Sequence, residues 1–392
     1  MPSPLKPRIV FPQAMAALKR SPALGILGAR QVGKSTLARQ LAKAAKRKVL
    51  FLDLESPADL DRLREPEAFL WRHRDRLIVI DEVQRMPELF PVLRSLIDRD
   101  RRPSRFLLLG SSSPELIRRS SESLAGRISY MDLFPFCIRE LRASERDRLW
   151  LRGGYPRAFL ARSHADAVRW AQDYLRDFTE RELALLGLNA DARGTRAMLA
   201  MLASVNGQPL NMNMIAKSIG MSGPTVKRYL HYFEQAFLVS VLPSYHMNLR
   251  KRLTSAPKVY LADTGLLHAQ LRIADLESLR TGIMAGTSWE GFVVQQVRAW
   301  LQGRAELHYF RTHDGSELDL IITQSLKPKV AIEIKTTNSP ALSKGNRLAF
   351  EAVNAPVQLI LTPDAGDHPY SKGIEVCSLN TVWKHLERAL GK

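Results

Sequence analysis

The chain has 392 residues, of which 45% are hydrophobic and 25% charged, and its 58 Lys and Arg residues outnumber 39 Asp and Glu residues to give a formal net charge of +19. This composition excludes a largely disordered chain, and no apolar run approaches the roughly 18–20 residues that span a bilayer. At about 100–200 residues per domain, the length predicts two to four domains.

The basic surplus favours a polyanionic partner, most often nucleic acid, and a generally basic soluble surface is the alternative. The N-terminus carries Lys6 and Arg8, but prolines interrupt it and no long apolar segment follows. A signal peptide is therefore not expected, and we expect a cytoplasmic location. Cys137 and Cys377 match no metal-binding spacing, so free, buried thiols are expected.

Four short apolar runs, separated by helical stretches, occupy the first part of the chain. They are residues 23–28, 49–54, 77–82 and 106–112. Short apolar runs between helices are typical of buried parallel strands in an α/β sheet. The sequence therefore predicts an α/β fold, with a first domain over residues 1–140.

The segment GARQVGKST follows the first of these runs and matches the phosphate-binding pattern G-x-x-x-x-G-K-[S/T]. Backbone N–H groups of such a loop cradle phosphate oxygens, and the helix that follows adds a partial positive charge. Lys34 is expected to reach the β- and γ-phosphates of ATP, and Ser35 to hold Mg²⁺. The expected nucleotide-binding residues are Gly28, Ala29, Arg30, Gln31, Val32, Gly33, Lys34, Ser35, Thr36 and Asp81.

Three further positions complete the expected hydrolytic site. The run LIVIDE ends in Asp81, which would face the metal, and Glu82, which would activate the attacking water. An acidic pair in the first turn of a helix is the alternative. Ser111, at the end of the next run, is expected to sense the γ-phosphate or the water. Arg127 would project into a neighbouring subunit's site and stabilise the transferring phosphoryl group, unless it forms a surface salt bridge.

Helical patterns dominate the middle of the chain. Residues 141–191 are predicted to form a helical lid, with a buried stripe at Val168, Ala171, Leu175 and Phe178 because these apolar residues recur at three- and four-residue steps. Residues 192–256 are predicted to form a further compact module.

Within that module, residues 210–239 have the pattern of a helix-turn-helix. Gly220 allows the turn and Ser222 caps the second helix. Ile215, Ala216, Ile219, Val226, Tyr229 and Leu230 are expected to face inward. Thr225, Lys227 and Arg228 would point outward, toward a major groove or phosphates. Residues 244–253 would add a basic strand or wing. A protein-interaction module is the alternative.

The last part of the chain, residues 257–392, returns to an α/β pattern and carries a second group of polar residues. Glu290 lies in a helical stretch, Asp319 in an alternating strand, and Glu333 and Lys335 in another strand. The alternation places Glu333 and Lys335 on one face. Asp319 and Glu333 are expected to hold Mg²⁺ with support from Glu290, and Lys335 to position the attacking water.

The series GARQVGKST, LIVIDEVQ, LLLGSSS, SLAGR and GGYP resembles the prokaryotic AAA+ ATPases that carry a C-terminal region of uncharacterised function. The resemblance implies an AAA+ core, a helical lid and a hexameric ring with Arg127 as its arginine finger. Arg157 and Arg181 are the lid candidates for a second sensor arginine. The C-terminal set looks like the PD-(D/E)xK nuclease superfamily, although Leu318 stands where that superfamily usually has proline.

Two functions remain open from the sequence. The first is an ATP-hydrolysing motor that acts on DNA, with a branched molecule such as a Holliday junction as one candidate substrate and a C-terminal domain that binds or cuts DNA. The alternative is an ATP-dependent switch or chaperone-like regulator that acts on a protein partner.

Overall fold

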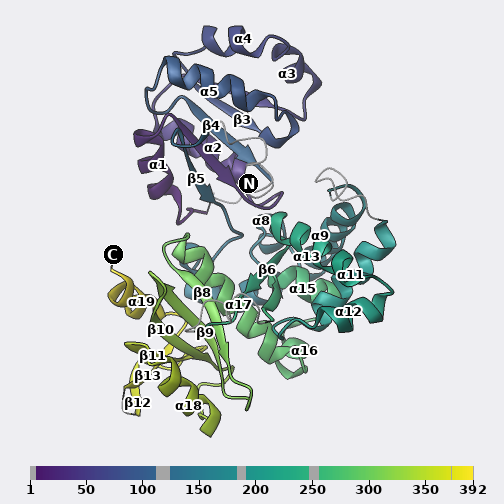
Figure 1. Cartoon of the computed structure of the whole chain (residues 1–392), viewed down its shortest axis with the longest axis vertical. Coiled ribbons are helices and arrows are strands. Elements are labelled where there is room, and N and C mark those ends of the chain that lie inside the picture. The colour runs from purple at the N-terminus through teal and green to yellow at the C-terminus, as the bar shows by residue number, and fades with distance from the viewer. Residues whose placement is uncertain (1–5, 112–123, 183–190, 247–255, 372, 392) are drawn as a thin grey trace.

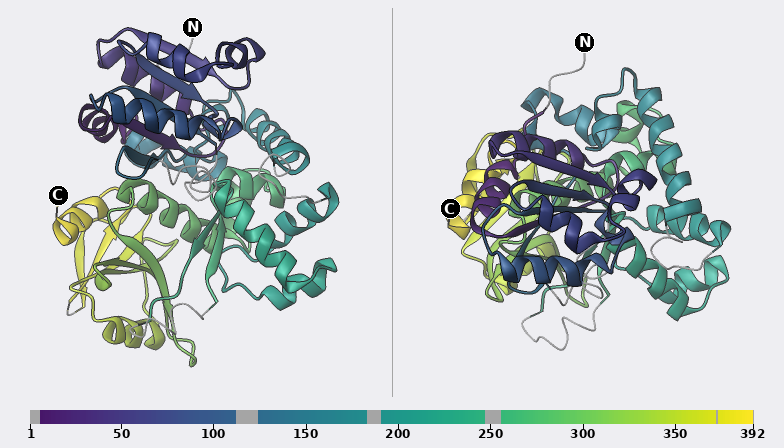
Figure 2. Two further views of the ribbon diagram at one scale, coloured as in Figure 1. Left: turned by 45° about the horizontal axis from the view of Figure 1, so that its top comes forward. Right: turned by 90° about the horizontal axis from the view of Figure 1, so that it is seen from above.

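The computed structural model describes residues 6–111, 124–182, 191–246, 256–371 and 373–391. An N-terminal α/β unit lies at one end of the molecule, and a mainly helical part and a C-terminal sheet lie side by side at the other (Figures 1 and 2). The serines that follow Ser111 and residues 247–253 of the expected wing lie outside the described residues, as does the side chain of Arg181. Among the described residues, no helix is both long enough and apolar enough to cross a membrane.

The N-terminal unit is a parallel five-stranded sheet in the order β2-β3-β4-β1-β5. Its elements are α1 (Phe11–Arg20), β1 (Ala23–Leu27), α2 (Lys34–Ala44), β2 (Val49–Asp53), α3 (Pro57–Arg62), α4 (Pro66–Arg72), β3 (Leu77–Asp81), η1 (Val83–Arg85), α5 (Leu89–Arg99), β4 (Phe106–Gly110) and β5 (Ile128–Asp132). The four strands predicted from the apolar runs are confirmed as β1 to β4. The strand β5 was not predicted, because it is only half-buried at the edge of the sheet and has no continuous apolar run.

Alternate strand residues of this sheet face two different helical layers. Leu24 and Ile26 pack in the cluster that contains α1 and α2, whereas Ala23 and Leu27 pack in the cluster that contains α5. Burial on both faces explains why β1 and β4 are apolar throughout. The parallel register brings the carboxyl ends of β1, β3 and β4 to one edge of the sheet.

The middle part is mostly helical. Its elements are η3 (Ile138–Glu140), η4 (Ala143–Glu145), α7 (Arg146–Arg152), α8 (Pro156–Phe159), α9 (His164–Asp177), η5 (Phe178–Glu182), α11 (Ala192–Ser204), α12 (Met212–Ile219), α13 (Gly223–Gln235), β6 (Val239–Leu242), β7 (Lys258–Leu261), α15 (Thr264–Leu271) and α16 (Leu276–Thr281). In the predicted stripe, Ala171, Leu175 and Phe178 are buried as expected, but Val168 is only half-buried and Ala167 is buried beside it.

The GGYP segment is fixed by a buried aspartate. Asp263 caps α15 and accepts a hydrogen bond from the backbone N–H of Gly154 at 2.7 Å. Gly153 has a φ of +75°, and a Cβ atom there would collide with the Asp263 carboxylate. Burial raises the pKa of Asp263 to about 6. These glycines therefore allow the helix α15 to dock against the lid.

The two short strands of the middle part alter one expected boundary. β6 and β7 pair antiparallel, with Val239 opposite Leu261. The boundary expected between residues 256 and 257 therefore separates two strands that share a sheet. We propose that the C-terminal domain instead begins at α17, after residue 281.

The C-terminal domain is a mixed sheet in the order β12-β13-β11-β10-β9-β8. Its elements are α17 (Ala285–Leu301), β8 (Glu306–Arg311), β9 (Glu317–Gln324), β10 (Lys327–Ile334), α18 (Lys344–Val353), β11 (Val357–Thr362), β12 (His368–Ser371), β13 (Ile374–Ser378) and α19 (Val382–Leu390). Along the chain, α17 is followed by three strands, the helix α18 and the strand β11. Helices α17 and α19 share one hydrophobic cluster of the sheet, and α18 packs in another. Cys137 and Cys377 are free and buried, as predicted.

Candidate active site

The phosphate-binding loop connects β1 to α2 at the carboxyl edge of the sheet. Gly33 caps α2 with a φ of +104°, a conformation that favours glycine. A Cβ atom on Gly28 would collide with the carbonyl oxygen of Leu133. The two glycines of the pattern are therefore required by backbone conformation and by close packing, respectively.

The lysine of the loop is buried, and its side chain folds back onto the backbone of the loop. Lys34 Nζ donates hydrogen bonds to the carbonyl oxygens of Gly28, at 2.9 Å, and Ala29, at 3.0 Å. Only 5% of its surface is exposed. The ammonium group therefore lies against the loop whose N–H groups are expected to bind phosphate. Arg30, by contrast, forms an ion pair with Glu55 outside the loop.

Ser35 and Asp81 meet as the sequence predicted. The hydroxyl of Ser35 donates a 2.6 Å hydrogen bond to Asp81 Oδ2, and the backbone N–H of Glu82 donates to Asp81 Oδ1 at 3.0 Å. Burial raises the pKa of Asp81, opposed by the bond from Ser35. A hydroxyl and a carboxylate at this distance are the oxygen ligands that Mg²⁺ prefers beside a phosphate.

Glu82 lies in a small polar network that the sequence only partly predicted. It adopts a left-handed conformation with a φ of +53°. Its Oε2 accepts a hydrogen bond from the hydroxyl of Ser111 at 2.9 Å and another from the side-chain amide of Gln84. The Gln84 amide also donates to Ser111 Oγ at 2.8 Å. Gln84 was missed because nothing in its local sequence distinguishes it from a surface residue.

A cavity of about 430 Å³ adjoins the loop. Its lining includes the loop and helix residues Gln31, Gly33, Lys34, Ser35 and Thr36, the acid Glu82, and, from outside the sheet, Lys6, Arg8, Pro156 and Arg157. The lid candidate Arg157 therefore faces the cavity, and α8 covers it at one side. The cavity has the size and the donor groups that a nucleotide requires.

Arg8 connects the phosphate-binding loop with the segment that leads into the lid. Its guanidinium donates to the carbonyl oxygens of Val32, at 3.1 Å, and Phe134, at 2.5 Å, and its Nε donates to Glu140 Oε1 at 3.0 Å. Both charged side chains are buried, with 7% and 2% of their surfaces exposed. Sequence reasoning did not find this ion pair because its members lie 132 residues apart.

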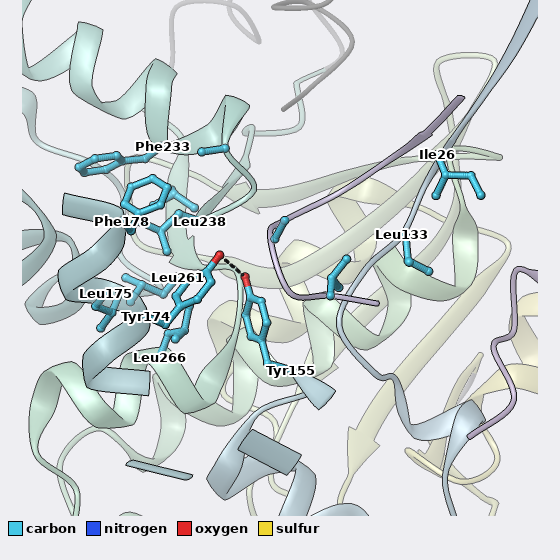
Figure 3. Packing of buried hydrophobic residues seen from close by; sticks show 14 of the residues in the cluster. Ile26, Leu133, Tyr155, Tyr174, Leu175, Phe178, Phe233, Leu238, Leu261 and Leu266 are labelled. Carbon is cyan, nitrogen blue, oxygen red and sulfur yellow. Dashed lines mark hydrogen bonds between the residues drawn. The ribbon is translucent and has the colours of Figure 1, made fainter. Parts of the chain in front are cut away.

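The lid packs tightly against the N-terminal unit. The hydroxyl groups of Tyr155 and Tyr174 are 3.2 Å apart. In Figure 3 these two tyrosines lie between Leu133 on one side and Leu175 and Leu266 on the other. One continuous hydrophobic cluster joins β1, α9, α13 and β7. Residues of the sheet and of the segment predicted as the lid therefore share one hydrophobic core.

Arg127 lies away from the cavity of its own chain. It precedes β5, whose first residue Ile128 is paired with Ala23 at the amino end of β1. Five residues of β1 separate that end from the loop, about 16 Å along the strand. In the structure Arg127 forms a bidentate ion pair with Asp98, at 2.9 and 2.8 Å, and lowers the pKa of that carboxyl to about 2.

Two capped helices joined by a short turn occupy the segment for which a helix-turn-helix was expected. Helix α12 ends at Ile219, Gly220 adopts a φ of +67°, and the Ser222 side chain caps α13. Lys227 and Arg228 are exposed, whereas Thr225 is only half-exposed. The inward residues Ile215, Ala216, Val226, Tyr229 and Leu230 are buried, and Ile219 is half-buried.

The C-terminal acids are near one another, but a lysine from another part of the chain lies among them. Lys258 Nζ is 2.7 Å from Glu290, 2.7 Å from Glu317 and 3.7 Å from Asp319. Lys335 pairs with Glu333 at 2.7 Å. Burial raises the pKa of Glu333 to about 8 and that of Glu290 to about 7. Across the described parts of the chain, no three His, Cys, Asp or Glu side chains form a group that could hold a metal ion.

The expected metal ligands Glu290, Asp319 and Glu333 thus have cationic neighbours from the chain itself. Lys258 lies beside Glu290 and Asp319, and Lys335 lies beside Glu333. Nothing in the sequence around residue 258 predicts this contact, because the lysine belongs to a strand outside the C-terminal sheet.

Comparison with known proteins gives three matches along the chain. A family model described as an AAA domain matches residues 20–142, and two models described as domains of unknown function match residues 144–277 and 285–382. The AAA domain and the loop geometry together make this protein an ATPase with a P-loop core.

An uncharacterized protein of Mycobacterium tuberculosis is 41% identical over 354 residues, which cover 90% of this chain and 79% of that protein. The chain belongs to its family. An uncharacterized protein of Mycobacterium bovis in the same family has the same identity and coverage.

Solved structures match more distantly. A Walker-type ATPase of Pyrococcus abyssi is 14% identical, with a TM-score of 0.47 over 68% of this chain and 96% of that chain. A RuvB mutant of Thermotoga maritima is 20% identical, with a TM-score of 0.31 over 59% and 87%. AMPPCP-bound DnaA from Aquifex aeolicus is 15% identical, with a TM-score of 0.31 over 57% and 86%.

Proposed function

We propose that this ATPase is a cytoplasmic motor that uses ATP hydrolysis to move along or remodel duplex DNA, with branched DNA such as a Holliday junction among its substrates. The observation that carries the proposal is the exposed basic surface of α13. Lys227 and Arg228 are exposed on a capped helix whose other side is buried, in a chain with a net charge of +19. A helix held in this way can lie in a major groove or against phosphates.

The nucleotide site would use the residues that the structure brings together. Lys34 and the loop N–H groups would bind the phosphates of ATP, and Ser35 with Asp81 would hold Mg²⁺. Glu82 would orient the attacking water, and Ser111 and Gln84 would hold Glu82 in place. The support is the 2.6 Å bond between Ser35 and Asp81 and the contact of Ser111 with Glu82.

A ring of subunits, which we propose to be a hexamer, would bring Arg127 into a neighbour's nucleotide site. The support is its position about 16 Å along the strand from its own loop, which prevents action within one chain. In a separate subunit Arg127 would pair with Asp98. At the subunit interface the guanidinium would leave Asp98 and bind the phosphate of the neighbour's nucleotide.

The test is the ATPase rate with no DNA, with linear duplex and with a four-way junction of the same length and composition. We expect both DNAs to raise the rate and the junction to raise it more. Binding should weaken steeply with salt because phosphate contacts release counterions. No response to either DNA at low salt would favour the alternative, a switch that acts on a protein partner.

A further inference from the structure

The acid cluster of the C-terminal domain consists of Glu290, Glu317, Asp319 and Glu333, and a lysine from another part of the chain lies among these side chains. Lys258 lies on β7, which pairs with β6 in the middle part of the chain. Its side chain is 3% exposed and its ammonium group is within 2.7 Å of both Glu290 and Glu317. The ring of Tyr309 lies 5.4 Å from the same nitrogen and completes its surroundings.

Other donors contact some of the same carboxylates. Tyr260, also on β7, donates its hydroxyl hydrogen to Glu290 Oε1, the same oxygen that Lys258 contacts. The backbone N–H of Ile334 donates to Asp319 Oδ2 at 2.8 Å, and Asp319 Oδ1 faces Lys258. A divalent ion would require several of these oxygens at about 2.0–2.6 Å, and the Lys258 ammonium group opposes it by competing for their lone pairs and by repulsion between like charges.

The backbone that carries Lys258 is held firmly against α17. Tyr260 packs so closely on α17 that a Cβ atom on Gly291 would lie 2.9 Å from its ring. Asn206 accepts from the N–H of Leu261 at 2.9 Å and donates to the carbonyl oxygen of Thr287 in α17. The strand that carries Lys258 is therefore fixed to the helix that carries Glu290.

We propose that Lys258 is the permanent cation of this cluster, so that the C-terminal domain is a metal-free domain that anchors β7 and does not cut DNA. The cluster stabilises the joint between the C-terminal domain and the helix-turn-helix module, in place of binding a divalent ion. This inference does not depend on whether the ATPase acts on DNA.

The decisive measurement is Mn²⁺ binding to the full chain without nucleotide, followed by electron paramagnetic resonance. We expect wild type and Asp319→Asn to bind the same amount of Mn²⁺ up to millimolar concentration. A wild-type Mn²⁺ site that is lost in Asp319→Asn would overturn the proposal, and so would Mg²⁺-dependent DNA cleavage that is lost in that variant.

A second measurement compares two lysines of the same cluster by thermal unfolding. Lys258→Met removes the ion-pair partner of the buried carboxylates Glu290 and Asp319, so we expect its Tm to fall by several degrees, on the order of 5 °C. Lys335→Met removes a lysine that pairs with Glu333 alone and is 26% exposed, and its Tm should change much less. Equal shifts in the two variants would contradict the proposed role of Lys258.

Discussion

The indole N–H of Trp170 donates a hydrogen bond to Gln31 Oε1 at 3.2 Å, so the lid helix α9 contacts the phosphate-binding loop directly. Gln31 also lines the nucleotide cavity. We expect ATP to change the tryptophan emission of the chain, because the loop must rearrange around the phosphates. The Trp170→Phe variant should lose most of this change, whereas Trp383→Phe, in the C-terminal helix α19, should keep it. The opposite pattern would place the response outside the lid.

Removal of the loop lysine should abolish hydrolysis. Lys34→Ala loses the ammonium group expected on the phosphates, and Glu82→Gln loses the group expected to activate water, so each should lower the ATPase rate at least ~10²-fold. Glu82→Gln should still bind nucleotide, while Lys34→Ala should bind it weakly. The exposed Lys43 lies on the same helix, and Lys43→Ala should have wild-type turnover. Normal hydrolysis by Lys34→Ala would refute the assignment of the nucleotide site.

The role of Arg127 can be separated from its salt bridge with Asp98. Arg127→Ala should hydrolyse ATP slowly but bind it normally, whereas Asp98→Asn removes only the intrachain partner and should remain active. Mixing Arg127→Ala with Glu82→Gln should restore part of the activity if a finger from one subunit completes the site of the next. If the mixture stays inactive and light scattering shows a monomer, the ion pair with Asp98 is the whole function of Arg127.

Charge reversal on α13 should weaken DNA binding. Lys227→Glu with Arg228→Glu removes two candidate phosphate contacts, and each lost contact should reduce the slope of log K against log salt by about 0.9. The chain offers a matched control, because Lys19 and Arg20 are also an adjacent, exposed Lys–Arg pair on a helix. Equal losses of DNA affinity in the two double variants would show that DNA binding depends on net charge alone.

A buried histidine should make the fold sensitive to acid. His268 donates from Nδ1 to the carbonyl oxygen of Leu151 at 2.9 Å, and its Nε2 accepts from the hydroxyl of Ser288 at 2.7 Å. Burial lowers its pKa to about 4, so the ring stays neutral in the folded chain while the unfolded chain protonates near 6.5. The unfolded state therefore binds the extra proton between these values, and stability is lost as the pH falls through this window.

The expected loss from His268 is on the order of 3 kcal/mol between pH 6.5 and 4. Urea unfolding at a series of pH values measures it. His268→Gln should flatten the dependence in this window, and His313→Gln, at an exposed position, should leave it unchanged. A His268→Gln variant whose stability changes with pH between 6.5 and 4.5 just as the wild type does would contradict the assignment of a neutral, buried ring, because the raised pKa of Asp263 acts on both proteins alike.

The sequence predicted what depends on local patterns. The loop between β1 and α2, the four buried strands and the cap at Ser222 follow from residues within a few positions of one another. The proximity of Ser35 and Asp81 could be predicted, because Asp81 ends one strand of a parallel sheet and Ser35 follows another strand at the same edge. The contacts of Arg8 with Glu140 and of Lys258 with Glu290 could not, because they join distant segments whose docking is set by packing.

The position of Lys258 in the acid cluster also affects the choice of fragments for study of the C-terminal domain. A fragment that starts at α17 would keep Glu290, Glu317, Asp319 and Glu333 but lose Lys258 and Tyr260. Its carboxylates would then recruit whatever divalent ion the buffer supplies. Metal content found in such a fragment would be an artefact of the cut, and would misidentify as a cofactor an ion that the intact chain excludes.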